Sequence, residues 1–174
     1  MVTTYEAGVR EQERDWAPPN DAPREGSVHR STASINGHPL HPMVVPIPIG
    51  LLTAAAASDL AHLLTGDAFW ARASRWLIGG GLLGGLVAAV LGMVDFRTIR
   101  AARGTVGTAH AAGNATILGL SGVSLLLRQG APRRVPVLAM ALSAVASGML
   151  PLTGWLGGEL SFRHGIGVIP DEDR

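Results

Sequence analysis

Residues 43–64 decide the fold, and they read MVVPIPIGLLTAAAASDLAHLL. Only Asp59 and His62, near the far end, interrupt this apolar run. About 20 apolar residues in a helix cover the roughly 30 Å hydrocarbon core of a bilayer. The stretch therefore predicts a helix that crosses a membrane.

Three further apolar runs predict three more membrane spans, at residues 76–94, 109–127 and 135–156. Pro151 should kink the last span or end it early. The connecting segments 65–75, 95–108 and 128–134 are short, so successive helices should be antiparallel neighbours. Helices this apolar would leave a soluble bundle without polar faces. We therefore predict an all-α membrane protein, a four-transmembrane-helix up-down bundle.

The chain divides into a membrane domain and two polar ends. Residues 1–36 hold four arginines against six acids and little apolar content, which predicts a disordered N-terminal tail. Residues 37–168 form the predicted four-span domain, and residues 169–174 an acidic C-terminal tail. The N-terminus lacks a basic region followed by an apolar core, so the first span should act as its own insertion signal.

Composition excludes several kinds of chemistry. The chain has no cysteine, which rules out disulfides, thiolate metal sites and cysteine nucleophiles. A net charge of +1 gives no basic field for nucleic acid. All fourteen basic residues are arginine, which is typical of a GC-rich bacterial genome and predicts a bacterial plasma membrane protein. Arginines near the spans number six on the side of the termini and five on the other, so the positive-inside rule places the termini in the cytoplasm.

Four spans bring the start of spans one and three and the end of spans two and four to one membrane face. Each of these places carries histidines, acids or an amide, and convergence from separate segments predicts a site. The residues are His38, His41, Asp95, His110, Asn114, Glu159 and His164.

Three interpretations of this cluster stay open. In the first, His41 and His110 are axial ligands of a b-type haem, with His38 and His164 as substitutes or hydrogen-bonding neighbours. In the second, the histidines bind Zn, Fe or Mn together with Asp95 or Glu159. In the third, no cofactor binds, and the polar groups cap helix ends and hydrogen-bond one another.

Asp59 and His62 lie at the opposite face, three residues apart near the end of the first span. We expect them to hydrogen-bond each other and to end the helix, because a charge costs much less near the interface than at the bilayer centre. A proton path or a second site is the alternative.

The sequence resembles the domain of unknown function 2231 family of predicted bacterial membrane proteins. The resemblance covers residues 36–168 and is most specific at its ends, in Gly37-His38-Pro39-Leu40-His41-Pro42 and in Gly154-Trp155-Leu156-Gly157-Gly158-Glu159-Leu160-Ser161-Phe162-Arg163-His164-Gly165. It implies a four-span membrane domain without an established activity. Some relatives carry or neighbour a Rieske-type iron-sulfur domain, which hints at electron transfer, but a chain without cysteine lacks that domain.

Three functions follow as hypotheses. The first is a haem-binding electron-transfer subunit that works with a redox partner or respiratory complex in the lipid bilayer. The second is a non-catalytic membrane subunit or a small-solute or proton carrier, and the third is a metal-dependent membrane enzyme. A strip of glycines in the second span allows close helix packing, either within the chain or in a homo-oligomer.

Overall fold

The first apolar segment forms two consecutive helices, α2 (Leu40–Val44) and α3 (Pro46–Thr65), joined at Val45. Pro46 stands at the first position of α3, where its missing N–H has no helical partner to lose. The helix ends at Gly66, whose φ of 69° lies in the left-handed region that glycine adopts without strain. Asp67 then begins the next helix, because its side chain accepts a hydrogen bond from the Phe69 amide.

Helix α4 (Ala68–Thr98) is longer than the span that the sequence predicted, 76–94. It begins eight residues earlier, because Arg72 and Arg75 are helical rather than part of a loop. Charged residues mark where a span meets water, but they do not stop a helix. The break at Gly66 and the cap at Asp67 set the boundary instead.

The second pair of helices is α5 (Thr105–Leu127) and α6 (Val137–Phe162). A short 3-10 turn, η1 (Arg100–Arg103), joins α4 to α5. The expectation that Pro151 ends the last helix early is wrong, since α6 continues to Phe162. Pro151 lies on the exposed side of α6.

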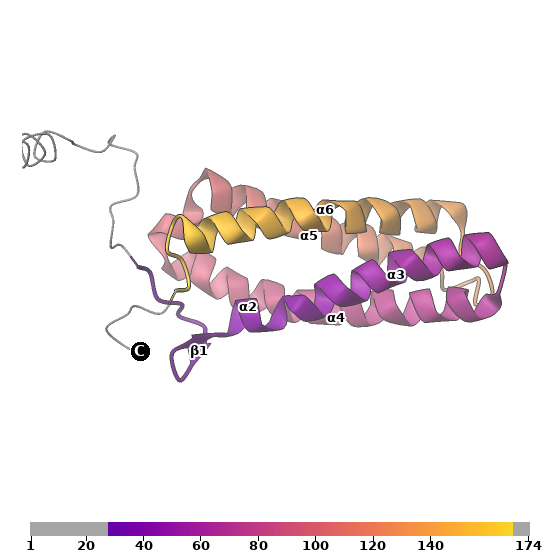
Figure 1. The fold of residues 1–174 in the computed structure, drawn as a ribbon, viewed down its shortest axis with the longest axis horizontal. Coiled ribbons are helices and arrows are strands. Elements are labelled where there is room, and N and C mark those ends of the chain that lie inside the picture. The colour runs from indigo at the N-terminus through magenta and orange to yellow at the C-terminus, as the bar shows by residue number, and fades with distance from the viewer. Residues whose placement is uncertain (1–27, 169–174) are drawn as a thin grey trace, which may run out of the picture.

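The described part of the chain, residues 28–168 in a computed structural model, is an elongated four-helix bundle (Figure 1). Helices α3 and α4 form one hairpin, and α5 and α6 form a second. The hairpins meet along α3 with α6 and α4 with α5, so α3 and α5 lie on one diagonal of the bundle. All four segments are long and apolar enough to cross a membrane. The predicted four-span, all-α fold is confirmed.

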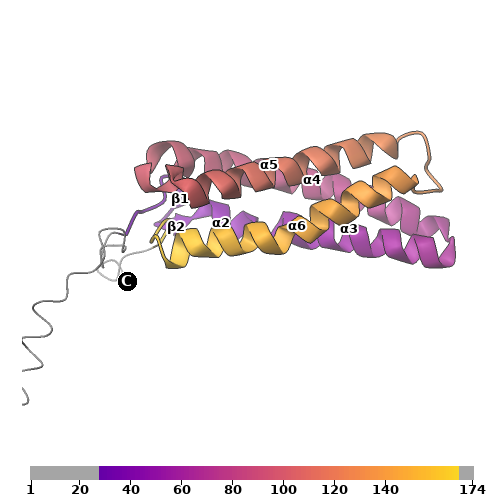
Figure 2. The ribbon, with the colours of Figure 1, turned by 90° about the horizontal axis from the view of Figure 1, so that it is seen from above.

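Residues 28–39, which the sequence assigned mostly to the tail, pack against one end of the bundle. Strand β1 (Ser34–Ile35) pairs with β2 (His38–Pro39) in a small antiparallel hairpin. The His29 amide donates to the Gly165 carbonyl at 2.9 Å, which joins this segment to the chain after α6. Both ends of the described chain therefore lie at the same end of the bundle (Figure 2). The predicted tails at 1–27 and 169–174 lie outside the described residues.

Candidate functional site

His41 projects from α2 toward α4 and is held there by the backbone. Its Nδ1 lies 2.8 Å from the Ala88 carbonyl oxygen. The ring packs over Gly92, where a Cβ atom would stand 3.0 Å from both Cε1 and Nδ1 of the imidazole. A side chain at this position would make the ring shift by a few tenths of an ångström.

His110 has the same arrangement in the second hairpin. Its Nδ1 lies 2.9 Å from the Thr153 carbonyl oxygen on α6. The ring packs over Gly157, where a Cβ atom would stand 3.1 Å from Cε1. Asn114, one turn further along α5, donates its amide to Nε2 of His110 at 3.2 Å and to the His110 carbonyl at 2.8 Å.

The two imidazoles face each other across the bundle. Their ring centroids are 6.3 Å apart and their planes are inclined by 83°. Both rings line a cavity of about 280 Å³ between the hairpins. Its other walls are mainly apolar or small, and include Pro48, Ile49, Ile117, Leu118 and Leu150.

The hydrogen bonds fix which nitrogen of each ring carries the proton. A backbone carbonyl only accepts, so Nδ1 of His41 and of His110 must be the protonated nitrogen. In a neutral imidazole this leaves Nε2 with its lone pair, which is the form that binds a metal. A backbone acceptor on the other nitrogen is also the usual support of a metal-binding histidine.

Asp95 lines the same cavity, but its carboxylate holds the N-terminal segment. Oδ2 accepts from the Ser31 hydroxyl at 2.7 Å, and Oδ1 accepts from the amides of Thr32 and Ala33 at 2.8 and 3.3 Å. The acid therefore fastens the strap of residues 28–39 to the end of α4.

The remaining members of the predicted cluster lie apart from the cavity. His38 is exposed, and its Nδ1 contacts the Asn36 carbonyl at 3.0 Å. Glu159 pairs with Arg163 at 2.8 Å on the surface, and His164 does not line the cavity. Within residues 28–168 no three His, Asp or Glu side chains converge in a way that suits a metal ion.

Comparison with known proteins gives the family. A family model described as "Predicted membrane protein (DUF2231)" matches residues 37–170. The chain belongs to this family. It is therefore an integral membrane protein of the DUF2231 family, as the resemblance at both ends of the domain predicted. Searches among curated proteins and among solved structures found no match.

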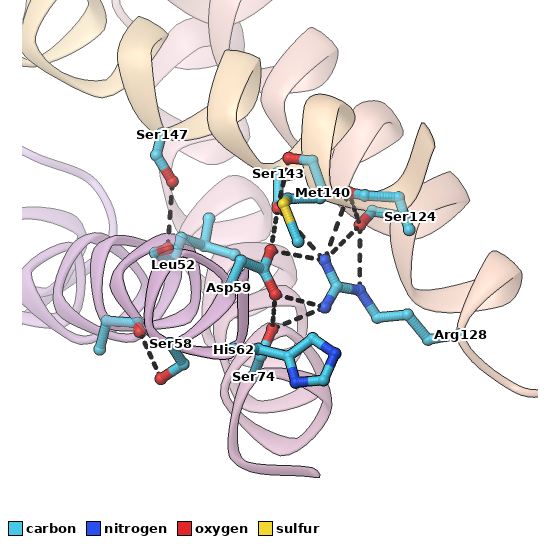
Figure 3. A network of polar contacts seen from close by, with 12 residues as sticks. Leu52, Ser58, Asp59, His62, Ser74, Ser124, Arg128, Met140, Ser143 and Ser147 are labelled. Atoms are coloured by element: carbon cyan, nitrogen blue, oxygen red, sulfur yellow. Dashed lines mark hydrogen bonds and ion pairs between the residues drawn. The ribbon is translucent and has the colours of Figure 1, made fainter. Parts of the chain in front are cut away.

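The opposite end of this DUF2231 bundle holds a buried ion pair that the sequence did not reveal. Arg128, only 1% exposed, donates from Nη1 and Nη2 to the two oxygens of Asp59, each at 2.7 Å. Ser74 and Ser143 both hydrogen-bond to Asp59 and both accept from Arg128. Figure 3 shows the guanidinium directed at the carboxylate between the helices.

The predicted pairing of Asp59 with His62 is therefore wrong. His62 Nδ1 instead contacts the Asp67 carbonyl at 3.0 Å, and α3 continues past both residues to Thr65. The carboxylate turns inward, because a guanidinium with two parallel N–H groups is a stronger partner in a dry interior than an imidazole.

Sequence reasoning missed Arg128 because it stands at the end of an apolar run, where an arginine normally reaches water. It also missed the two carbonyls that hold the histidines and the glycines beneath them. One signal was available for Arg128. An acid inside an apolar span requires a partner, and Arg128 follows directly after the apolar end of another span.

Proposed function

We propose that this protein binds a b-type haem between His41 and His110 and passes electrons within the membrane. The observation that carries the proposal is the matched support of the two rings. Each imidazole donates Nδ1–H to a backbone carbonyl, so Nε2 is the nitrogen that would hold an iron ion; in His110 that nitrogen accepts from Asn114.

The separation of the rings supports the same proposal. If both Nε2 atoms held one iron ion at about 2 Å with the two rings in line, the ring centroids would stand about 6 Å apart, and the centroids here are 6.3 Å apart. The walls of the cavity are mainly apolar, as the faces of a haem macrocycle are, and the two histidines would be the residues that hold its iron. Asn114 donates to Nε2 of His110, and that hydrogen bond would have to break for the nitrogen to bind iron.

The test is an absorption spectrum of the detergent-purified protein, oxidised and reduced, after expression with ample haem. We expect a Soret band and reduced-state bands typical of two axial histidines. His41→Ala and His110→Ala should each remove this signature. His38→Ala is the matched control, since that ring is exposed and lies outside the cavity, and it should leave the spectrum unchanged. A wild-type protein without a Soret band would overturn the proposal.

A second function, a non-catalytic membrane subunit or proton carrier, is favoured by one observation. Asn114 satisfies Nε2 of His110, and a centroid distance of 6.3 Å also lies within the range of direct edge-to-face ring contacts. The cluster is then complete without a ligand. His110→Ala separates the two functions, because here it should leave spectrum and metal content unchanged while association with a partner is lost.

We also propose that the chain lies in a plasma membrane with its termini in the cytoplasm. The arginines near the spans support this orientation, with six on the side of the termini and five on the other. The positive-inside rule favours the more basic side as cytoplasmic.

A further inference from the structure

The two helical hairpins repeat the same contacts. In each hairpin, a histidine near the start of the first helix donates a hydrogen bond to a backbone carbonyl on the second helix. The ring of the same histidine packs on a glycine four residues after that carbonyl. The two sets are His41 with Ala88 and Gly92, and His110 with Thr153 and Gly157.

The buried positions repeat as well. An offset of 69 residues along the first helix and of 65 along the second carries the inward face of one hairpin onto that of the other. The matched buried residues are Pro48, Leu52, Ala55 and Asp59 with Ile117, Ser121, Ser124 and Arg128, and Ser74, Ile78, Gly81, Gly85 and Ala88 with Ala139, Ser143, Ala146, Leu150 and Thr153.

Short identities in the sequence agree with these offsets. Gly50-Leu51 corresponds to Gly119-Leu120, and Leu91-Gly92 corresponds to Leu156-Gly157. Both hairpins start at the same end of the bundle, and corresponding helices lie on its diagonals (Figures 1 and 2). The hairpins are thus related by a pseudo-two-fold axis along the length of the bundle, which is the arrangement of parallel repeats in membrane proteins.

Two pairs of equivalent residues meet on this axis. His41 and His110 meet at one end, and Asp59 and Arg128, which the same offset of 69 residues separates, meet at the other. The equivalent residues at the first end are both histidines, whereas those at the second end carry opposite charges. An acid and a base at equivalent positions attract across the axis, whereas two identical charges would repel.

We propose that Asp59 and Arg128 are a positioning pair, which joins the two repeats on the axis and thereby sets the separation of His41 and His110 at the other end. At this end Asp59 bonds Ser143 and Arg128 bonds Ser74 across the two hairpins, and one further hydrogen bond, from Ser147 to the Leu52 carbonyl, joins the hairpins closer to the histidines. Helix α5 runs without a break from His110 to its end at Arg128, a rise of roughly 27 Å over which it transmits the spacing. The consequence for the ligand rests on the proposed function, but the consequence for the spacing does not.

Spin-label distances in the full chain test the spacing without any ligand. The chain has no cysteine, so Val90→Cys and Trp155→Cys introduce the only two labelling sites. These positions are equivalent under the repeat, are 65% and 70% exposed, and flank the histidine end of α4 and α6. Their distance distribution is measured in three backgrounds: the native pair, the neutral pair Asp59→Asn with Arg128→Gln, and the exchanged pair Asp59→Arg with Arg128→Asp.

We expect a narrow distribution with the native pair, a broadened or shifted one with the neutral pair, and a return toward the narrow one with the exchanged pair. Haem affinity should fall at least about tenfold with the neutral pair, which is the range usual for groups that orient ligands. It should recover with the exchanged pair. An unchanged distribution in the neutral variant overturns the positioning role. An exchanged pair that restores nothing overturns the equivalence of the positions.

The outcomes also separate this inference from the proposed function. A protein that never binds haem but whose label distance follows the charge pair supports the positioning role and overturns haem binding. If the neutral variant does not accumulate in the membrane, the exchanged variant is the test. An exchanged variant that accumulates and has the native label distance supports the positioning role of the pair, and an exchanged variant that does not accumulate overturns that role.

Discussion

Gly92 and Gly157 decide how closely the histidine rings approach the opposite helices. A methyl group at either position would lie 3.0 or 3.1 Å from ring atoms of His41 or His110, closer than ordinary van der Waals contact. The ring would have to turn away, and its Nδ1 would lose the alignment with the backbone carbonyl. These glycines thus control the direction of Nε2.

Gly92→Ala should weaken haem binding by about tenfold, because crowding of this kind typically costs 1–3 kcal/mol. The measurement is a haem titration of the apoprotein in detergent. Gly79→Ala is the matched control on the same helix, since no atom of another element in residues 28–168 lies within 4 Å of a Cβ atom there, and it should bind like the wild type. Equal affinity in both variants would show that the ring position does not matter for binding.

At the scale of single residues, the sequence predicted which polar side chains share one cavity. His41, His110, Asn114 and Asp95 do line one cavity, as convergence of the span ends indicated. The partners of these residues were not predictable, because a hydrogen bond to a backbone carbonyl leaves no trace in residue types. The role of Asp95 also depends on the fold of residues 31–33, for which the polar composition gave no sign.

At the scale of elements, the strap of residues 28–39 depends on one acid. Asp95 is 9% exposed and accepts from the amides of Thr32 and Ala33. Removal of the acceptor leaves these amides without a protein partner of equal strength, since hydrogen bonds to a charged group contribute about 1.5–3 kcal/mol.

Asp95→Ala should therefore raise the hydrogen-exchange rates of the Thr32 and Ala33 amides by at least about tenfold, which corresponds to 1.4 kcal/mol. The measurement is hydrogen exchange with mass spectrometry on the detergent-solubilised protein. Glu159→Ala, which removes a surface pair at the same end, should leave the rates unchanged. Unchanged rates in Asp95→Ala would mean that other contacts hold the strap.

Helix existence was predictable and helix length was not. Each span was found from its apolar run, because a bilayer imposes a minimum length on every crossing. The ends of α4 depend on Gly66, Asp67 and the turn after Thr98, and apolar content says nothing about such caps. Pro151 misled for a different reason, since a proline removes one hydrogen bond within its own helix but does not end a transmembrane helix whose other hydrogen bonds continue.

At the scale of the whole molecule, four crossings fix which segments share a side of the membrane. Ser34 belongs to the strap and Arg133 to the loop between α5 and α6, and both are exposed. In intact cells, an impermeant maleimide should label Arg133→Cys and should label Ser34→Cys only after the membrane is opened. The chain has no native cysteine to interfere. Labelling of Ser34→Cys alone in intact cells would reverse the proposed orientation, and labelling of both would contradict the fold.

The pattern of spans determined the architecture, but the internal repeat was visible only after the structure showed which positions face inward. The two hairpins share few identical residues, and the most important equivalent pair consists of an acid and a base. An alignment of the two hairpins by residue type scores Asp59 against Arg128 as a mismatch. Their burial and their contact show that they occupy equivalent positions in the two hairpins.

The buried ion pair also has a consequence for synthesis. Asp59 enters the membrane with the first hairpin, and its partner lies 69 residues further along the chain. At about 5–20 residues per second, the ribosome needs roughly 3–14 s to deliver that arginine. During this interval the first hairpin carries an acid without its base. The first hairpin therefore has to stay in contact with the insertion machinery until the second hairpin is synthesised. The order of the two hairpins along the chain is thus part of how the molecule assembles.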